Sequence, residues 1–323
     1  MVAAVRVYKP GGPEVMKYED IEVGAPGPGE LKVRVRACGL NYIDTYFRSG
    51  LYPPPSSPFV LGNEGAGDVT AVGPDVKEFK VGDRVAWVAL GSYAAERLLP
   101  ADRAVKLPEG ISYEQAAGMM LKGMTVQYLL RRTYKVQKGD NVLIHAAAGG
   151  VGLIACQWAN HLGANVIGTV GSKQKAELAK SHGCRHVILY NEEDFVARVK
   201  EVTKGELCPV VYDGVGKATF PGSLDCLRPL GLFVSFGNAS GPIEAFNLGI
   251  LSQKGSLYVT RPTLATYTAN REDLLATAND LFQVVTSGAV KIPINQKYSL
   301  KEVVKAHQDL EGRRTTGTTV LIP

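Results

Sequence analysis

An apolar run that gives way to small residues, and then resumes with helical spacing, limits what this chain can fold into. Residues 142–145 read Val-Leu-Ile-His, residues 146–150 are all alanine or glycine, and apolar side chains then recur at Val151, Ile154 and Ala155. This is the pattern of a buried strand, a tight turn and a helix with one apolar face. Small residues in such a turn let backbone N–H groups at the start of the helix approach an anion, typically a dinucleotide pyrophosphate.

Five more apolar segments follow this unit, and helical patterns separate most of them. Residues 191–205, for example, predict a helix that Asn191 caps and Gly205 ends. Strands that alternate with helices favour an α/β fold with a doubly wound, six-stranded parallel sheet, the Rossmann fold. The six predicted strands lie within residues 141–146, 164–170, 185–190, 208–213, 231–237 and 255–260.

The residues before this sheet have a different pattern. Leu31, Val33 and Val35 alternate with charged residues, which predicts a strand with one buried face. Turn-forming Gly and Pro residues recur at short intervals around it, which indicates a compact, mostly antiparallel barrel. The last apolar segment, residues 318–323, is expected to return to this barrel. The predicted domains are therefore 1–124 with 263–323 for the barrel, and 125–262 for the parallel sheet.

Composition excludes several classes of protein. The chain has 323 residues, 45% of them hydrophobic and 21% charged, as in ordinary globular proteins. Its formal net charge of +5 is too small to indicate nucleic-acid binding. No segment approaches the roughly 20 apolar residues that cross a bilayer, and no signal peptide is recognised, so a cytoplasmic protein is expected. None of the five cysteines stands in a C-x-x-C pair, so neither a zinc ribbon nor a redox dithiol is expected.

The segment after the second predicted strand decides between the two nicotinamide cofactors. The turn after the first strand is a loosened dinucleotide fingerprint, A-x-x-G-x-x-G over residues 146–152. An NAD site usually places a carboxylate about 20 residues further on, at the ribose 2′-hydroxyl. Here no carboxylate comes before Glu177, and Ser172, Lys173 and Lys175 stand in that place. Positive charge and hydroxyl donors suit a 2′-phosphate, which predicts NADPH.

Several motifs of the chain together resemble one known family. They are GGPEV, GLNYIDTYFRSGLYPPP, LGNEGAG, VGDRV, LKGMTVQYLL, HAAAGGVGLIACQWA, VVYDGVG and VSFGNASG. Over essentially the whole chain they resemble the zeta-crystallin-like quinone oxidoreductases of the medium-chain dehydrogenase/reductase superfamily. The resemblance implies a GroES-like domain joined to a Rossmann domain, with an active site in the cleft between them. It also implies a homodimer paired through the edge of the Rossmann sheet, around residues 255–262.

The resemblance also bears on metal binding. Zinc-using relatives place a cysteine where this chain has Asn41 and a histidine where it has Asn63. Glu64 remains, but an asparagine is a poor ligand for zinc, which prefers thiolate and imidazole. No metal site is therefore expected, and alcohol oxidation through a metal-bound alkoxide is excluded from the predicted activities.

The resemblance further implies which residues form the site. Asn41 and Tyr46 are expected to flank the nicotinamide and the substrate and to act in catalysis. Tyr46 is the candidate donor to a quinone oxygen, and an aromatic wall without a proton role is an equal alternative. Asp44 is expected to touch the cofactor or to cap the helix that follows. Asn41, Asp44 and Tyr46 are also counted as cofactor contacts, together with Thr125, Tyr128, Ala148, Gly149, Gly150, Val151, Gly171, Ser172, Lys173, Lys175, Tyr190, Phe236, Asn238 and Arg313, with Arg314 as the alternative to Arg313.

Zinc-independent, NADPH-dependent reduction of quinones, by hydride or electron transfer from the nicotinamide, is the predicted function. A quinone carbonyl already withdraws charge, so the protein has to supply only orientation and a donor to the developing oxyanion. An NADPH-dependent reductase of 2-alkenals or enones on the same fold is one alternative. A non-enzymatic role, as a crystallin-like protein or in binding AU-rich RNA, is the other. RNA binding calls for a basic stripe interleaved with aromatic residues, which the sequence does not show.

Overall fold

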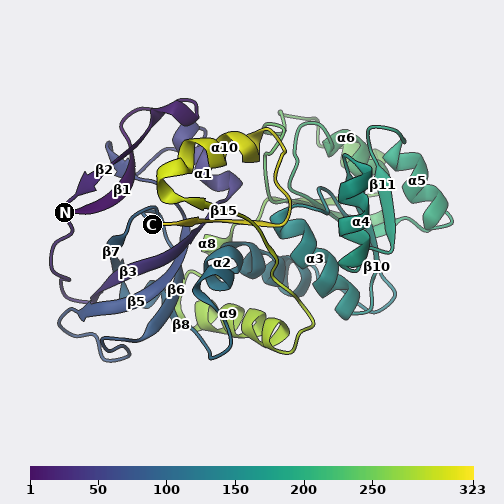
Figure 1. The fold of residues 1–323 in the computed structure, drawn as a ribbon. Helices are drawn as coiled ribbons and strands as arrows, with labels where there is room; N and C mark the ends of the chain where they lie inside the picture. Colours follow the sequence, from purple (N-terminus) through teal and green to yellow (C-terminus); the bar gives the residue numbers. More distant parts are fainter. The chain divides into compact units, whose positions relative to one another are not determined.

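The computed structural model describes residues 1–323, which form two compact units (Figure 1). We call them the antiparallel unit and the parallel unit, after their sheets. The antiparallel unit comprises Met1–Lys122, Asn270–Phe282 and Ile292–Pro323, and the parallel unit comprises Gly123–Ala269 and Gln283–Lys291. No helix in the structure is both long enough and apolar enough to cross a membrane.

The parallel unit is built on a six-stranded sheet with the strand order β11-β10-β9-β12-β13-β14, and all neighbouring strands are parallel. Its strands are β9 (Asn141–Ile144), β10 (Asn165–Val170), β11 (His186–Leu189), β12 (Cys208–Asp213), β13 (Leu227–Ser235) and β14 (Tyr258–Thr260). Its helices are α3 (Gly150–His161), α4 (Lys173–Ser181), α5 (Phe195–Val202), α6 (Phe220–Asp225), α7 (Gly249–Gln253) and α8 (Leu264–Tyr267). Counted along the chain this order is 3-2-1-4-5-6, that of the Rossmann fold.

Each of the six strands overlaps the segment predicted for it. The central strands were predictable because strands covered on both faces read as continuous apolar runs. All six residues of β12 are buried, and β9 pairs with β12 in register from Val142 and Val210 onward. The core of this unit joins side chains from five neighbouring strands, including Leu143, Ile167 and Phe233. The strand order reverses between β9 and β12, and ligands of open α/β sheets bind at the carboxyl ends of the strands at such a point.

One predicted cap is wrong. The helix between β11 and β12 begins at Phe195, and its N-cap is Asp194, whose side chain accepts hydrogen bonds from the backbone N–H groups of Val196 and Ala197. Asn191 instead donates its side-chain amide to the carbonyl oxygen of Gly171. Both residue types cap helices well, so composition alone does not choose between positions three residues apart.

The antiparallel unit contains a three-stranded sheet, β2-β1-β4, and a seven-stranded sheet, β15-β16-β3-β5-β6-β8 with β7 also paired to β3. Its strands are β1 (Val2–Val7), β2 (Met16–Ile21), β3 (Glu30–Gly39), β4 (Phe59–Val60), β5 (Glu64–Val72), β6 (Arg84–Val88), β7 (Glu96–Pro100), β8 (Ala104–Lys106), β15 (Ile294–Ser299) and β16 (Thr318–Ile322). All strand pairs in it are antiparallel except β15 with β16. Its own helices are α1 (Tyr42–Ser49) and α10 (Val303–Glu311).

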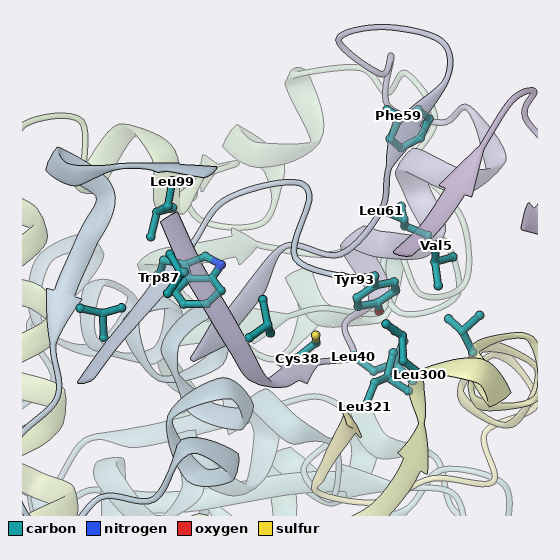
Figure 2. Packing of buried hydrophobic residues seen from close by; sticks show 14 of the residues in the cluster. Val5, Cys38, Leu40, Phe59, Leu61, Trp87, Tyr93, Leu99, Leu300 and Leu321 are labelled. Atoms are coloured by element: carbon teal, nitrogen blue, oxygen red, sulfur yellow. The ribbon is translucent and has the colours of Figure 1, made fainter. Parts of the chain in front are cut away.

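The core of the antiparallel unit is made by side chains from both ends of the chain. Trp87, Tyr93 and Leu99 are fully buried in it together with Leu321 (Figure 2). The last strand, β16, pairs antiparallel with β3, where Leu321 lies opposite Cys38. The prediction that the C-terminal strand returns to the N-terminal sheet is therefore confirmed.

Two helices continue from one unit into the other. The units change after residues 122, 269, 282 and 291, whereas the sequence predicted changes after residues 124 and 262. Helix α2 (Tyr113–Tyr128) passes from one unit into the other after Lys122, and α9 (Arg271–Thr286) does so after Phe282. The segment before α9 belongs to the parallel unit because the ring of Tyr267 stacks on that of Tyr128, with centroids 4.4 Å apart. Residues 283–291 belong there because the carbonyl oxygen of Lys291 accepts a hydrogen bond from Gln157 of α3.

Candidate active site

The turn between β9 and α3 forms an N-terminus open to an anion. Gly149 is the N-cap of α3 and has no side-chain hydrogen bond, so the first N–H groups of the helix have no partner within it. Gly149, Gly150 and Val151 are half-buried, whereas Ala148 is buried. A Cβ on Gly152 would overlap the Ala146 carbonyl oxygen and lie 2.7 Å from that of Ala147, so only glycine lets α3 pack this close to the turn. The arrangement has the form of a pyrophosphate site.

The end of β10 and the start of α4 carry positive charge without a carboxylate. Ser172 is the N-cap of α4, and its hydroxyl oxygen accepts a hydrogen bond from the backbone N–H of Lys175 at 3.3 Å. Lys173 is exposed and Lys175 half-buried, and the first turn of the helix has no acidic residue. Cations at a helix N-terminus oppose the helix dipole. An anionic group bound here would offset that repulsion.

Tyr190 lies beside this helix start. A Cβ on Gly171 would lie 2.6 Å from the Tyr190 hydroxyl oxygen, so the phenol packs against the backbone that leads into α4. Tyr190 is 41% exposed, which leaves the residue accessible to a flat ligand. The structure thus brings Gly171, Ser172 and Tyr190 together at the carboxyl ends of β10 and β11.

The loops after β12 and β13 are tied to each other through Asp213. Its carboxylate accepts hydrogen bonds from the backbone N–H groups of Val215 and Gly216 and from the Thr219 hydroxyl. Asp213 is therefore a turn-forming residue, and both of its carboxylate oxygens are engaged. Phe236 donates its backbone N–H to the Asp213 carbonyl oxygen.

The other residues expected to contact the nicotinamide half or the length of the cofactor are half-buried or buried. The ring of Phe236 lies 2.9 Å from the position of a Cβ on Gly214, so it packs over that glycine. Asn238 accepts the backbone N–H of Gly241 on its carbonyl oxygen, closing a turn. Thr125 and Tyr128 lie on α2 and are buried, and burial raises the pKa of the Tyr128 phenol.

Helix α1 of the antiparallel unit begins at a buried polar cluster. Asp44 is fully buried, and its carboxylate accepts hydrogen bonds from the Asn41 backbone N–H at 2.8 Å, the Tyr93 hydroxyl at 2.8 Å and the Asn63 side-chain amide at 2.7 Å. Asp44 therefore caps α1, one of its two expected roles. Burial raises the pKa of the Asp44 carboxyl to about 6, against the lowering effect of these hydrogen bonds. Tyr46 lies two residues after Asp44 on α1, and its ring is edge-on to that of Tyr52, with centroids 5.2 Å apart.

Glu64 accepts hydrogen bonds from three groups that the sequence did not reveal. It is the first residue of β5 and is fully buried. Its Oε1 accepts hydrogen bonds from the Asn41 side-chain amide at 2.8 Å and from the Lys122 ammonium at 2.7 Å, and its Oε2 accepts the backbone N–H of Leu121 at 2.6 Å. Lys122 was missed, although a signal for it exists: it is the one charged residue between Glu114 and Arg131 in an apolar helical segment.

The structure separates the two arginines of the EGRR motif. Arg314 binds Asp309 at 2.7 Å and donates to the Gln308 carbonyl oxygen, and hydrogen bonds from Lys305, Tyr298 and Arg314 lower the pKa of the Asp309 carboxyl. Arg314 is thus part of an ion-pair cluster beside α10. Arg313 has a positive φ of 56°, so its backbone turns away from the helix.

Comparison with known proteins identifies the two units. Residues 27–129 match the alcohol dehydrogenase GroES-like domain, and residues 150–279 match the zinc-binding dehydrogenase domain. A quinone oxidoreductase of Pseudomonas aeruginosa is 58% identical over 315 residues, 97% of each chain. The crystal structure of Escherichia coli quinone oxidoreductase complexed with NADPH is 52% identical, covers 99% of this chain and 100% of its own, and has a TM-score of 0.98. A 2-haloacrylate reductase from Burkholderia is 45% identical over 100% of this chain and 99% of its own.

A GroES-like unit of mostly antiparallel strands and a Rossmann unit with a glycine-rich first turn define a medium-chain dehydrogenase/reductase, an oxidoreductase. Within that superfamily the chain belongs to the quinone oxidoreductases.

The domain family that matches residues 150–279 is named for zinc binding, but the residues of the antiparallel unit do not fit that metal. Asn41 and Asn63 both direct their amide N–H groups at carboxylates, those of Glu64 and Asp44. Glu64 is already bound to the ammonium of Lys122. Zinc needs thiolate, imidazole or carboxylate donors, whereas amide N–H groups and an ammonium are hydrogen-bond donors with no lone pair to offer. The residues around Asn41 therefore offer zinc no suitable set of ligands.

Proposed function

We propose that the protein reduces quinones with NADPH and without zinc. The observation that carries the choice of cofactor is the first turn of α4, where two lysines and the Ser172 hydroxyl follow β10 and no carboxylate does. A carboxylate there would hold the 2′-hydroxyl of NADH and repel the 2′-phosphate of NADPH. The similarity to the NADPH complex of the Escherichia coli enzyme supports the same choice.

The residues of the parallel unit would bind the cofactor along the carboxyl ends of its strands. Backbone N–H groups of Ala148, Gly150 and Val151 would meet the pyrophosphate at the N-terminus of α3. The N–H of Gly149 donates to the Ala146 carbonyl oxygen, so Gly149 would contact the pyrophosphate only through its Cα. Bound NADPH supplies a hydride at the nicotinamide. The remaining expected contacts are Gly171, Ser172, Lys173 and Lys175 at the adenosine ribose phosphate, Tyr190 at the adenine, Phe236 and Asn238 at the nicotinamide half, Thr125 and Tyr128 along the cofactor, and Arg313 as a further cation.

The residues of the antiparallel unit would receive the acceptor. Asn41 is the N-cap of α1 and Tyr46 lies in its first turns, so one helix carries both residues. We assign to the Tyr46 hydroxyl the hydrogen bond to the quinone oxygen on which negative charge develops. Asn41 orients the nicotinamide and the acceptor, and Asp44 holds Asn41 through its backbone N–H.

A second candidate is the reduction of an activated carbon–carbon double bond, as in a 2-alkenal or enone. Its support is the 45% identity to a 2-haloacrylate reductase over almost the whole length of both chains. Initial rates of NADPH oxidation with 1,4-benzoquinone, a naphthoquinone, an ortho-quinone and a 2-alkenal separate the candidates. Turnover of the quinones above that of the alkenal supports the first proposal, and turnover of the alkenal alone supports the second. Binding of NADPH with no turnover of any acceptor would favour the non-enzymatic role.

We also propose that the protein is a homodimer paired through β14. This strand is the last in the order of the parallel sheet, so one of its edges has no neighbour in the chain. Tyr258 is 61% and Val259 38% exposed, and Leu248 of the same unit is exposed as well. An exposed edge strand with apolar side chains is a surface for strand pairing.

A further inference from the structure

A buried ion pair lies directly behind Asn41 in the antiparallel unit. Lys122 Nζ is 2.7 Å from Glu64 Oε1, and the two side chains are only 6% and 0% exposed. The neighbours of Lys122 on α2, such as Met119, Met120 and Met124, are fully buried and apolar. A lysine and a glutamate in such surroundings are costly unless each neutralises the other. Such a pair therefore calls for a reason beyond packing.

The architecture makes room for the Glu64 carboxylate. A Cβ on Gly39, the last residue of β3, would overlap Glu64 Oε1 and the Ala117 carbonyl oxygen. Gly39 pairs with Glu64 across β3 and β5, so the space for the carboxylate is built into the sheet register. Three donors converge on it, from the Asn41 side chain, from the backbone of α2 and from Lys122.

The ion pair contacts Asn41 through the Glu64 carboxylate. The side-chain Nδ2 of Asn41 donates to Glu64 and its backbone N–H donates to Asp44, so both ends of the residue are fixed. A carboxylate accepts only, so it selects the amide orientation that turns Nδ2 toward Glu64 and Oδ1 away from it. We propose that Lys122 is a positioning residue: its ammonium keeps Glu64 ionised inside the protein, and ionised Glu64 holds the Asn41 amide in one orientation. This inference rests on the proposed function insofar as Asn41 orients the nicotinamide and acceptor.

Removal of the ammonium changes what Glu64 offers. In Lys122→Met the carboxylate is buried without a counter-charge, a situation that favours the protonated acid. A carboxylic acid carries an O–H donor, so it no longer selects one orientation of the Asn41 amide. The double variant Lys122→Met with Glu64→Gln is neutral at both positions at every pH, and the carbonyl oxygen of the introduced glutamine side chain can still accept the Asn41 amide. The other titratable groups that face this cluster are Asp44, Tyr93 and Cys38, and every variant retains them.

Thermal unfolding at two pH values tests the ion pair without any substrate. For Lys122→Met we expect a Tm about 10 °C below that of the wild type near pH 8, where folding must bury the Glu64 charge unpaired or protonate it at a cost. The deficit shrinks near pH 5, because protonation then removes the buried charge more easily. The double variant should show a deficit that is the same at both pH values. Lys297→Met is the matched control, since it removes an exposed ion pair with Glu114 of the same helix α2.

The orientation of Asn41 is read by NMR of protein labelled with ¹⁵N only at asparagine, with the side-chain signal assigned by its loss in Asn41→Ser. We expect a single sharp pair of NH₂ signals in the wild type and the double variant, and broadened or doubled signals in Lys122→Met near pH 8. Kinetics add the functional part: kcat with a quinone falls about tenfold or more in Lys122→Met, NADPH affinity changes less than about twofold, and the double variant recovers most of kcat.

Each outcome is decisive. Unchanged Asn41 signals in Lys122→Met, or a double variant no better than the single one, would overturn the positioning role. A Tm deficit that is the same at pH 5 and pH 8 would refute the dependence on a charged Glu64. If the wild type turns over no quinone, the proposed function fails, while the NMR and Tm results still decide whether Lys122 orients Asn41.

Discussion

Replacement of both lysines at the start of α4 should move stability and cofactor affinity in opposite directions. In Lys173→Gln with Lys175→Gln the first turn loses two cations that oppose the helix dipole. The exposed cation of Lys173 costs roughly 0.3–1 kcal/mol, so its removal should raise the free energy of unfolding without cofactor by about 0.5 kcal/mol. A purely structural role for these lysines would give no such gain on their removal.

The same change should weaken NADPH binding. A hydrogen bond to a charged group is worth roughly 1.5–3 kcal/mol, and solvent reduces that value for the exposed Lys173. A loss of at least about 2 kcal/mol is expected for the pair, which is roughly a 30-fold increase in the Kd of NADPH. The Kd of NADH should stay within about twofold, since NADH lacks the 2′-phosphate.

Isothermal titration with each cofactor and chemical denaturation of the free protein measure both effects on one sample. The matched control is Lys180→Gln, which removes a lysine from the last turn of the same helix, where it is bonded to Glu177. It should leave the ratio of the two Kd values unchanged. An unchanged ratio in the double variant would refute the assignment of the 2′-phosphate to this turn.

Three further predictions follow from single residues. Tyr46→Phe should lower kcat by roughly 10²-fold with little change in KM if the hydroxyl meets the developing oxyanion, whereas near-normal turnover would leave Tyr46 as an aromatic wall. The Asp44 carboxyl has a pKa of about 6 in the folded protein, against an ordinary 3.8. Its contribution to the free energy of unfolding is therefore present below about pH 4 and is lost as the pH rises through about 6, by roughly 3 kcal/mol. Asp44→Asn should remove this decline in denaturation curves, and an identical decline in both proteins would contradict the raised pKa. Val259→Pro should convert the proposed homodimer to monomer in analytical ultracentrifugation, because proline disrupts an edge strand, and a dimer that persists would place the interface elsewhere.

The parallel sheet was predictable because local sequence and burial agree in it. Strands such as β12 are buried on both faces, so each is a continuous apolar run. The glycines of the turn at Gly149 to Gly152 indicate close packing of backbone and a pyrophosphate site. Helix ends were less predictable. Asn191 and Asp194 are equally good caps by residue type, so the sequence alone does not show that Asp194 caps α5.

The polar cluster behind α1 could not be predicted from the sequence, because its members are far apart in the chain. Asn41, Glu64 and Lys122 meet only when β3, β5 and α2 pack together, and no spacing rule links them. A lysine in an apolar helix signals a buried partner but does not say which one. The boundaries between the units differ from the predicted ones for a similar reason. Helices α2 and α9 each continue from one unit into the other, and the spacing of apolar residues in a helix does not change where one unit ends.

Steady-state oxidation of NADPH with 1,4-benzoquinone, by protein treated with a chelator and shown by elemental analysis to be free of metal, tests the central claim most directly. The residues around Asn41 and the first turn of α4 predict undiminished turnover in the chelated protein and a kcat/KM for NADPH far above that for NADH. Loss of turnover with the metal and recovery on adding zinc, or an equal preference for NADH, would contradict the account.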